Sequence, residues 1–491
     1  MIPKKYYSLV LFILGFGIFV FTRLSKLVPT IPIAILISFI LILRFSRIKK
    51  NNWLTFLGFL LSINIGLWGL FELGGDISSL MFNIIRSSLL ALLYFLPFMI
   101  DRYIYPKFKD KWYSTLVFPV ITTAIFYILT IEGPFEGDIQ PAKFAFGILI
   151  FKQFLSLFGS LGFVFLTSWL ASVVNYMWEN KFDWKKIRKI TYILSSIIII
   201  IILFGTIKVH MLPKADTVKV AAIIIDPDWG KETLMEKVFA DRITSSFEET
   251  LAKIKDKTKI AASNNAKIVS FMEFAIIIDE EDHDNLREEL KRIAQENNIY
   301  LTITYGYYVK DGKGKNIHLL IDNNGEILLD YQKRYLAGIG ELAEKGVFVI
   351  GPEIIQSVDT PYGKIGLSVC RDMEMSKFII QAAKADVDIM FSSAYEWPKT
   401  WLPNNLQTPI VNGFSLVRPA YNGVTHIQDY NGKILGEMYF EDTDTGILYA
   451  DVPTKGVKTL YSYVGKLIGW LSALGLLVLT VLAIINRKRE K

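Results

Sequence analysis

Eight long apolar stretches restrict what this chain can fold into more than any other feature. Seven of them precede residue 210 and one lies near the C-terminus. Each is close to or above the length that crosses a hydrocarbon core. They cover, approximately, residues 6–22, 29–43, 53–71, 79–100, 113–131, 144–175, 190–207 and 464–486. Because 52% of all residues are hydrophobic, we expect an eight-helix, multi-pass membrane protein rather than a soluble one.

The loops between these stretches indicate how the chain crosses the membrane. If the N-terminus is cytoplasmic, the segments expected inside are rich in Lys and Arg, as at residues 44–50, 102–111, 181–189 and 487–491. The segments expected outside are mostly acidic or nearly neutral. The positive-inside rule therefore places both termini in the cytoplasm and residues 210–460 outside. The net charge of +7 follows from this topology, so no nucleic-acid partner is expected.

Residues 210–460 have the pattern of a separate polar domain in which strands alternate with helices. The expected strands are Val218–Ile225, Lys267–Met272 and Tyr300–Tyr308, and the expected helices are Glu232–Lys255 and Asp284–Glu296. Two β-hairpins follow, at 317–331 and 424–438, and their turns contain Gly325 and Gly432. This pattern predicts an α/β domain with two layers of sheet flanked by helices. The chain then divides into a seven-helix membrane part (1–209), the polar domain (210–460), and a last helix with a basic tail (461–491).

Three ionisable residues stand at the ends of apolar strands in the polar domain. Glu273 follows the strand at 267–272, Lys333 follows the strand at 327–331, and Cys370, the single cysteine, closes the strand at 365–369. A helix expected from Met373 to Lys384 would place Cys370 near helix N–H groups that favour a thiolate. Each residue alone is commonly structural. Together they supply a nucleophile, a proton acceptor and a cation for an oxyanion.

The order of these residues resembles the nitrilase, or carbon-nitrogen hydrolase, superfamily. The matching segments are Met272-Glu273-Phe-Ala, Lys333-Arg-Tyr-Leu-Ala-Gly-Ile-Gly-Glu341, Ser368-Val-Cys370-Arg-Asp372, Ser392-Ser-Ala-Tyr-Glu-Trp397 and Arg418-Pro-Ala-Tyr-Asn422-Gly423. Seven spans before the domain and one after it resemble the membrane-bound branch of that superfamily, the apolipoprotein N-acyltransferases. The resemblance implies an αββα sandwich inserted before the last of eight transmembrane helices.

The resemblance also implies roles for individual residues. Glu273 would be the general base, Lys333 the oxyanion-stabilising cation and Cys370 the nucleophile. Supporting residues are expected at Glu341, Arg371 and Asp372, and substrate contacts at Trp397, Trp401, Tyr335, Arg418 and Asn422. Apolar residues in 335–348 and 397–402 are expected to form flaps over the substrate entrance, or to be ordinary surface loops. The chain departs from the family pattern at Arg371-Asp372, where the acyltransferases usually have Tyr-Glu, and at Val411, where an acidic residue is common.

The activity that the resemblance implies is a two-step acyl transfer. A membrane phospholipid would acylate Cys370, and the α-amine of the diacylglyceryl-modified N-terminal cysteine of a lipoprotein would take the acyl group. We expect a monomer in the bacterial inner membrane with its catalytic domain on the extracytoplasmic face. One alternative is a membrane-anchored amidase in which water replaces the amine, and another is an inactive binding or transport protein.

No cofactor or metal is expected for this chemistry. Esters and thioesters are good acyl donors to an amine, so neither a metal nor a nucleotide is required. The four histidines do not have the spacing of metal ligands. They stand at His210, His283, His318 and His426.

Overall fold

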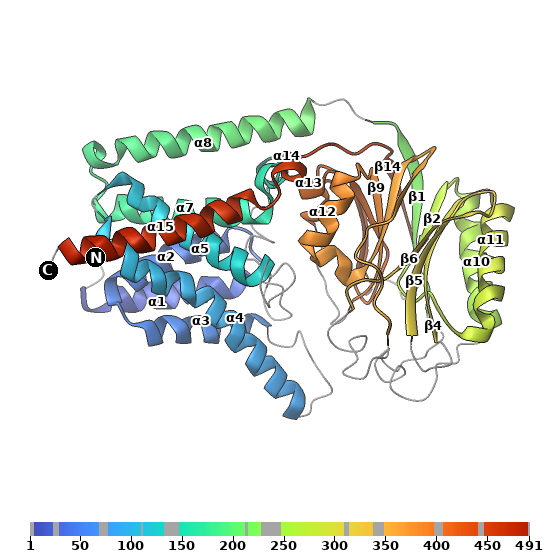
Figure 1. Ribbon diagram of the computed structural model, residues 1–491, viewed down its shortest axis with the longest axis horizontal. Helices are drawn as coiled ribbons and strands as arrows, with labels where there is room; N and C mark the ends of the chain where they lie inside the picture. The colour runs from blue at the N-terminus through green and yellow to red at the C-terminus, as the bar shows by residue number, and fades with distance from the viewer. Residues whose placement is uncertain are drawn as a thin grey trace. The chain divides into compact units, whose positions relative to one another are not determined.

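A computed structural model of the protein describes residues 4–22, 29–67, 77–109, 111–131, 147–211, 215–226, 247–308, 314–336, 348–396, 406–439 and 446–489 (Figure 1). The chain divides into two compact units. The first comprises Met1–Leu212 together with Val464–Lys491, and the second comprises Pro213–Tyr463.

The first unit is helical. Its helices are α1 (Lys4–Phe19), α2 (Ala34–Lys49), α3 (Asn52–Leu67), α4 (Ile77–Ile104), α5 (Val117–Phe126), α6 (Leu149–Lys152), α7 (Leu155–Glu179), α8 (Trp184–His210) and α15 (Leu467–Arg489). Within the described residues, five helical segments are long and apolar enough to cross a membrane: Ile84–Lys107, Trp112–Ile131, Leu155–Glu179, Trp184–His210 and Leu467–Ile485. Two shorter apolar helices cover Tyr6–Thr22 and Asn52–Leu67. These segments indicate a membrane protein, whereas the expected total of eight crossings stays a prediction.

A buried ion pair links two helices of this unit. Arg47 of α2 donates through Nε to Oδ2 of Asp101 at 2.9 Å and through Nη2 to Oδ1 at 3.0 Å. Asp101 belongs to α4, and its side chain is completely buried. The two parallel bonds match the planar guanidinium to the carboxylate, which sets the register of α2 against α4.

The second unit contains two seven-stranded sheets. The first has the order β14-β1-β2-β4-β5-β6, with β3 pairing with β4, and the second has the order β13-β12-β10-β9-β8-β7, with β11 pairing with β9. The strands of the first are β1 (Thr217–Ile224), β2 (Ile268–Phe271), β3 (Ile276–Asp279), β4 (Tyr300–Tyr308), β5 (Gly314–Ile321), β6 (Ile327–Gln332) and β14 (Gly446–Pro453). Those of the second are β7 (Ser357–Thr360), β8 (Gly363–Val369), β9 (Ile389–Tyr395), β10 (Ser415–Arg418), β11 (Ala420–Tyr421), β12 (Val424–Gln428) and β13 (Ile434–Tyr439).

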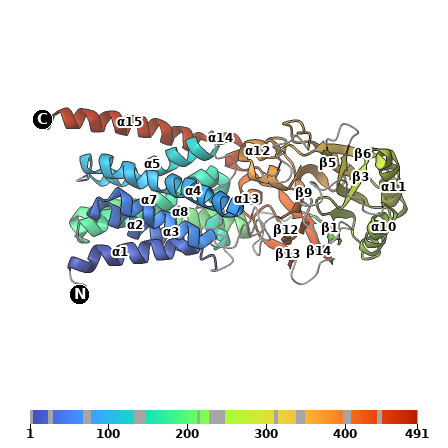
Figure 2. The same cartoon turned by 90° about the horizontal axis from the view of Figure 1, so that it is seen from below.

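The second unit also contains α-helices among its described residues. They are α10 (Phe247–Ser263), α11 (His283–Glu296), α12 (Ser376–Lys384), α13 (Thr408–Asn412) and α14 (Leu460–Val464). Helices α10 and α11 lie on one side of the paired sheets and α12 on the other, as Figure 1 and Figure 2 both show. The unit is therefore the expected α/β sandwich with the layer order α, β, β, α.

Side-chain alternation along β1 shows how the layers are held together. Val218, Val220 and Ala222 join the core between the two sheets, while Ala221 and Ile223 join the core beneath α10 and α11. Successive side chains of a strand point to opposite faces, so a continuous apolar run serves two cores at once. This explains why residues 220–224 are apolar without interruption rather than alternating with polar residues.

Two of the predicted helices have different limits in the structure. The helix predicted at Glu232–Lys255 is observed as α10, which continues to Ser263, and residues 227–246 lie outside the described part of the chain. The helix predicted to start at Met373 starts at Ser376, because Cys370–Glu374 forms a 3₁₀ turn and Met375 is extended. Both predicted hairpins are present, and Gly325 and Gly432 have φ of 81° and 83° in their turns.

Candidate active site

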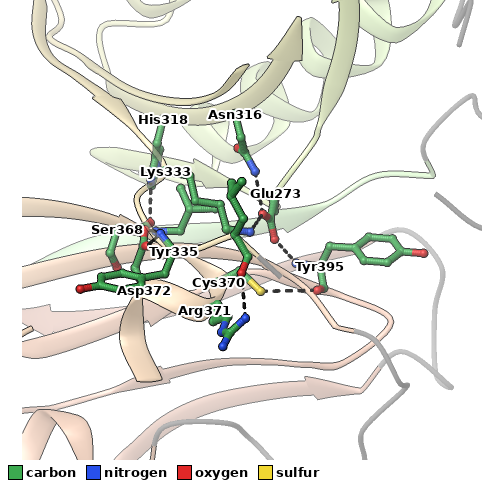
Figure 3. A network of polar contacts seen from close by, with 12 residues as sticks. Glu273, Asn316, His318, Lys333, Tyr335, Ser368, Cys370, Arg371, Asp372 and Tyr395 are labelled. Carbon is green, nitrogen blue, oxygen red and sulfur yellow. Dashed lines mark hydrogen bonds and ion pairs between the residues drawn. The ribbon is translucent and has the colours of Figure 1, made fainter. Parts of the chain in front are cut away.

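Strand ends from both sheets bring the site together. Glu273 follows β2 and Lys333 follows β6, and these strands run in the same direction because β4, β5 and β6 alternate in direction after the parallel pair β2 and β4. Cys370 follows β8, and Tyr395 is the last residue of the parallel neighbour β9. When strands of a sheet run in the same direction, the residues at their C-terminal ends lie at the same edge of that sheet. The two edges meet at the network in Figure 3.

Two hydrogen bonds tie the sheets to each other close to this edge. Ser393 Oγ, on β9, donates to the carbonyl oxygen of Phe271, on β2, at 2.7 Å. His318, on β5, contacts the carbonyl oxygen of Ser368, on β8, through Nδ1 at 3.0 Å. Burial lowers the pKa of His318 to about 4, so the ring is neutral and Nδ1 carries the proton in this bond. The positions of these strand ends are thus fixed relative to one another.

A buried ion pair forms the centre of the site. Lys333 Nζ lies 2.7 Å from Glu273 Oε1, and the two side chains are 1% and 2% exposed. Asn316 Nδ2 donates to the same oxygen at 2.9 Å, and the backbone N–H of Tyr395 donates to Oε2 at 2.7 Å. Several donors to one carboxylate favour its ionised form and fix its orientation. Glu273 is therefore held as an oriented base.

The Cys370 sulfur lies beside this carboxylate. Its Sγ is 3.6 Å from the carbonyl oxygen of Tyr395, so one residue contacts both the sulfur and Glu273. Cys370 has a φ of 45°, in the left-handed region, which costs a non-glycine residue about 1–3 kcal/mol. This backbone turn carries the side chain away from the path of β8 and toward the end of β9.

The surroundings of Cys370 disfavour the expected thiolate. Burial raises the pKa of Cys370 well above its usual value, the negative charge of Glu273 raises it further, and Lys333 lowers it. Burial and Glu273 outweigh Lys333, which contradicts the expectation of a lowered pKa. The helix expected to favour the thiolate is also displaced, because Cys370 begins a 3₁₀ turn and the first α-helix after it begins only at Ser376. The sulfur therefore needs a base at the moment of reaction.

Asp372 fixes the turn that presents the sulfur. It accepts hydrogen bonds from Val369 N at 2.9 Å, Tyr331 Oη at 2.7 Å and Tyr335 N at 2.7 Å. Burial raises the pKa of Asp372 to about 6, against the opposing effect of these donors and of Lys333. One carboxylate thus connects the nucleophile turn to the segment that follows the lysine.

Comparison with known proteins identifies the kind of domain that contains this network. The family model described as carbon-nitrogen hydrolase matches residues 224–461. This part of the chain is a carbon-nitrogen hydrolase domain. The deaminated glutathione amidase of Dictyostelium discoideum is 25% identical over 255 residues, which cover 44% of this chain and 86% of that protein. The human deaminated glutathione amidase is 30% identical over 122 residues, which cover 22% of this chain and only 37% of that protein.

Two solved structures are similar to about half of the chain. An amidase from Nesterenkonia sp. is 19% identical with a TM-score of 0.41, and the match covers 50% of this chain and 94% of that one. A structure of the same amidase in complex with butyramide has the same identity, TM-score and coverage.

Of the other expected site residues, some lie next to the network and others fall outside the described part of the chain. Tyr335 packs its ring on Phe378 and donates its hydroxyl to Glu353 at 3.1 Å, so its backbone rather than its side chain joins the network. Arg371 is partly exposed and donates through Nη1 to the carbonyl oxygen of Leu336 at 2.9 Å. Glu341, Trp397 and Trp401 lie outside the described residues, as do most of the two expected flaps.

Arg418 and Asn422 support Tyr395 and its neighbour. The Arg418 side chain is 2% exposed and donates to Glu396 Oε1 at 2.9 Å and to Ser392 Oγ at 3.1 Å. Asn422 Nδ2 donates to the hydroxyl of Tyr395 at 3.1 Å. These contacts favour a positioning role for both residues over the predicted contact with substrate.

Several residues of the site were not predicted from the sequence. Asn316 stands directly before the apolar run 317–321, and a polar side chain at the start of a buried strand is a weak signal. Tyr331 was assigned only to its strand, although its hydroxyl reaches Asp372. The contribution of Tyr395 comes from its backbone N–H and C=O, and every residue but proline carries both groups, so no sequence signal marks it.

The described residues of the carbon-nitrogen hydrolase domain hold no group of three or more His, Cys, Asp and Glu suited to a metal ion. Burial lowers the pKa of His426 to about 4, and its Nδ1 contacts the carbonyl oxygen of Val424. The chemistry that these residues offer is a thiol with a base, a cation and backbone donors around it.

Proposed function

We propose that Cys370, Glu273 and Lys333 catalyse acyl transfer through a thioester. The carboxylate of Glu273 takes the thiol proton as Sγ attacks an ester carbonyl, and a carbon–sulfur bond forms. Lys333 and the backbone N–H of Arg371, in the first turn after β8, stabilise the oxyanion. The carbon–oxygen bond then breaks, and Glu273 returns the proton to the departing alcohol. The observation that carries this proposal is the backbone of Tyr395, whose N–H contacts Glu273 and whose carbonyl oxygen contacts Cys370.

The proposed acyl donor is a membrane phospholipid, and the proposed acceptor is the α-amine of a diacylglyceryl-modified N-terminal cysteine on a lipoprotein. In the second step the amine attacks the thioester, Glu273 accepts a proton from the amine, and the Cys370 thiol is regenerated. Support for lipid substrates comes from the five long apolar helices in the same chain, because both substrates carry acyl chains that stay in a bilayer. The basic loops favour a domain on the extracytoplasmic face of a cell membrane.

A second candidate is amide hydrolysis, in which water replaces the amine. The observation that favours it is the 25% identity with the deaminated glutathione amidase of Dictyostelium discoideum over 255 residues. Both candidates share the first half of the reaction, since an amide or an ester would acylate the same sulfur. They differ in the leaving group and in the acceptor.

Full-length protein in nanodiscs separates the candidates. Phospholipid with a labelled acyl chain is incubated with a diacylglyceryl-modified peptide whose N-terminal amine is free. Acyl transfer predicts label in the peptide, and no transfer to a matched peptide with an acetylated amine. Label found only as free fatty acid would identify a hydrolase and overturn the transferase. Persistence of either product with Cys370→Ala would overturn the assigned nucleophile.

A further inference from the structure

Arg371 is a cation directly next to the nucleophile. It is the second residue of the turn Cys370–Glu374, and its side chain is partly exposed. Figure 3 shows Arg371 and Cys370 within one network of polar contacts. Arg371 Nη1 donates a hydrogen bond to the carbonyl oxygen of Leu336 at 2.9 Å. A guanidinium has five N–H donors, so most of its capacity remains available.

The other cations of the site already have anionic partners. Lys333 is paired with Glu273 at 2.7 Å, and Arg418 is paired with Glu396 at 2.9 Å. Within the described residues, Arg371 forms no ion pair, since no carboxylate oxygen there lies within 4.0 Å of its nitrogens. Arg371 is therefore the cation beside the sulfur that has no direct carboxylate partner among the described residues.

We propose that Arg371 binds an anionic group, a phosphate or a carboxylate, on the substrate that acylates Cys370. Both groups present paired oxygens that match the fork of a guanidinium, and such bonds are stronger than bonds between neutral groups. A cation at this position orients the substrate carbonyl toward Sγ, because residue 371 adjoins the sulfur in the chain. The inference rests on the proposed function, since it takes Cys370 as the nucleophile.

The competing role for Arg371 is a tether that holds the carbonyl of Leu336. A tether acts on every substrate alike, whereas a binding residue acts only on substrates that carry the charge. Selectivity between matched charged and neutral substrates therefore separates the two roles. The pairs are succinamate against butyramide, which test a carboxylate, and phospholipid against diacylglycerol, which test a phosphate. The neutral activated ester p-nitrophenyl butyrate reports the reactivity of Cys370 itself.

The experiment compares kcat/KM for these donors in the full-length protein. With Arg371→Gln, we expect kcat/KM for the anionic member of one pair to fall by about 10- to 100-fold. The neutral member and p-nitrophenyl butyrate should change by less than about threefold, and Arg371→Lys should restore part of the loss. The pair that responds identifies the anion as carboxylate or phosphate.

Arg334→Gln is the matched control. Arg334 also donates to a backbone carbonyl, that of Gly351 at 3.2 Å, but it has an anionic partner in Glu353 at 3.0 Å. Its removal should leave the charged-to-neutral ratio unchanged. Equal losses on both members of each pair with Arg371→Gln, or no preference of the natural protein for either anion, would overturn the inference. Failure of p-nitrophenyl butyrate to acylate Cys370 would overturn the proposed function instead.

Discussion

The carbonyl oxygen of Tyr395 lies 3.6 Å from the sulfur of Cys370, while the amide nitrogen of the same residue donates to Glu273 at 2.7 Å. A backbone segment at the end of β9 thus sets the separation between Cys370 and Glu273, the proposed nucleophile and base. Since a displacement of about 1 Å at a catalytic group can cost about a hundredfold in rate, whatever holds this segment influences catalysis. Glu396, the next residue, is held by Arg418 at 2.9 Å.

Replacing Arg418 with Gln should destabilise the domain and impair catalysis together. The change leaves Glu396 buried without its cationic partner, which costs about 3–5 kcal/mol for a buried pair. Thermal unfolding in detergent measures the stability, and acylation of Cys370 measures the function. The double variant Arg418→Gln with Glu396→Gln should regain most of the stability, because no unbalanced charge remains. An unchanged melting temperature in the single variant would contradict the structural role of the pair.

Asp372→Asn should change how stability depends on pH. Burial raises the pKa of Asp372 to about 6, from an ordinary value of 3.8, so the folded state binds the proton more tightly than the unfolded state. The stabilisation from this proton is complete below pH 4 and is lost as pH rises through 6, by about 3 kcal/mol for two pKa units. The advantage of the natural protein over the Asn variant should therefore shrink between pH 4 and pH 7. Melting temperatures of both proteins across this range provide the measurement, and a constant difference would contradict the argument.

Arg47→Ala should destabilise the helical unit by about 3–5 kcal/mol, because Asp101 is left buried without its bidentate partner. The measurement is the melting temperature of the full-length protein in detergent. Lys189→Ala is a suitable control. This lysine is exposed, its Nζ lies over the ring of Trp112, and it pairs with no carboxylate in the described residues. A similar fall in melting temperature in both variants would show that the Arg47–Asp101 pair does not stabilise the unit more than the Lys189 contact does.

The sequence predicts the parts of the site that depend on strand endings. Glu273, Lys333 and Cys370 each follow an apolar run, and such runs identify buried strands because their side chains must leave water. An ionisable residue at the end of a buried strand can remain only at an edge, where partners are available. The two-layer fold follows from the same runs, since residues 220–224 of β1 are apolar on both faces of the strand.

Other parts of the site depend on backbone geometry that side-chain types do not specify. Neither the left-handed φ of Cys370 nor the 3₁₀ turn after it has a sequence marker, because no glycine or helix cap stands at that position. The raised pKa of Cys370 depends on its burial and on the distance to Glu273, and both arise only when two separate sheets pack. Asn316 reaches Glu273 for the same reason, from a strand far along the chain.

Glu273→Gln should change two rates at Cys370 in opposite directions. Removing the negative charge lowers the pKa of the thiol, because Glu273 raises that pKa and Lys333 lowers it. Alkylation by iodoacetamide at pH 8 should therefore become faster, and its pH midpoint should move down. Acyl transfer should become slower by about 10²- to 10⁴-fold, since the general base is lost. Mass spectrometry measures alkylation without interference, because Cys370 is the only cysteine in the chain.

Lys333→Met provides the opposite electrostatic change and completes the test. Loss of the positive charge should raise the pKa of Cys370 further, so alkylation at pH 8 should slow, and acyl transfer should fall because the oxyanion loses its cation. Only the Gln variant at 273 should then combine faster alkylation with slower acyl transfer. If that variant slowed both reactions, the carboxylate would be acting through the structure of the site rather than through its charge and its proton affinity.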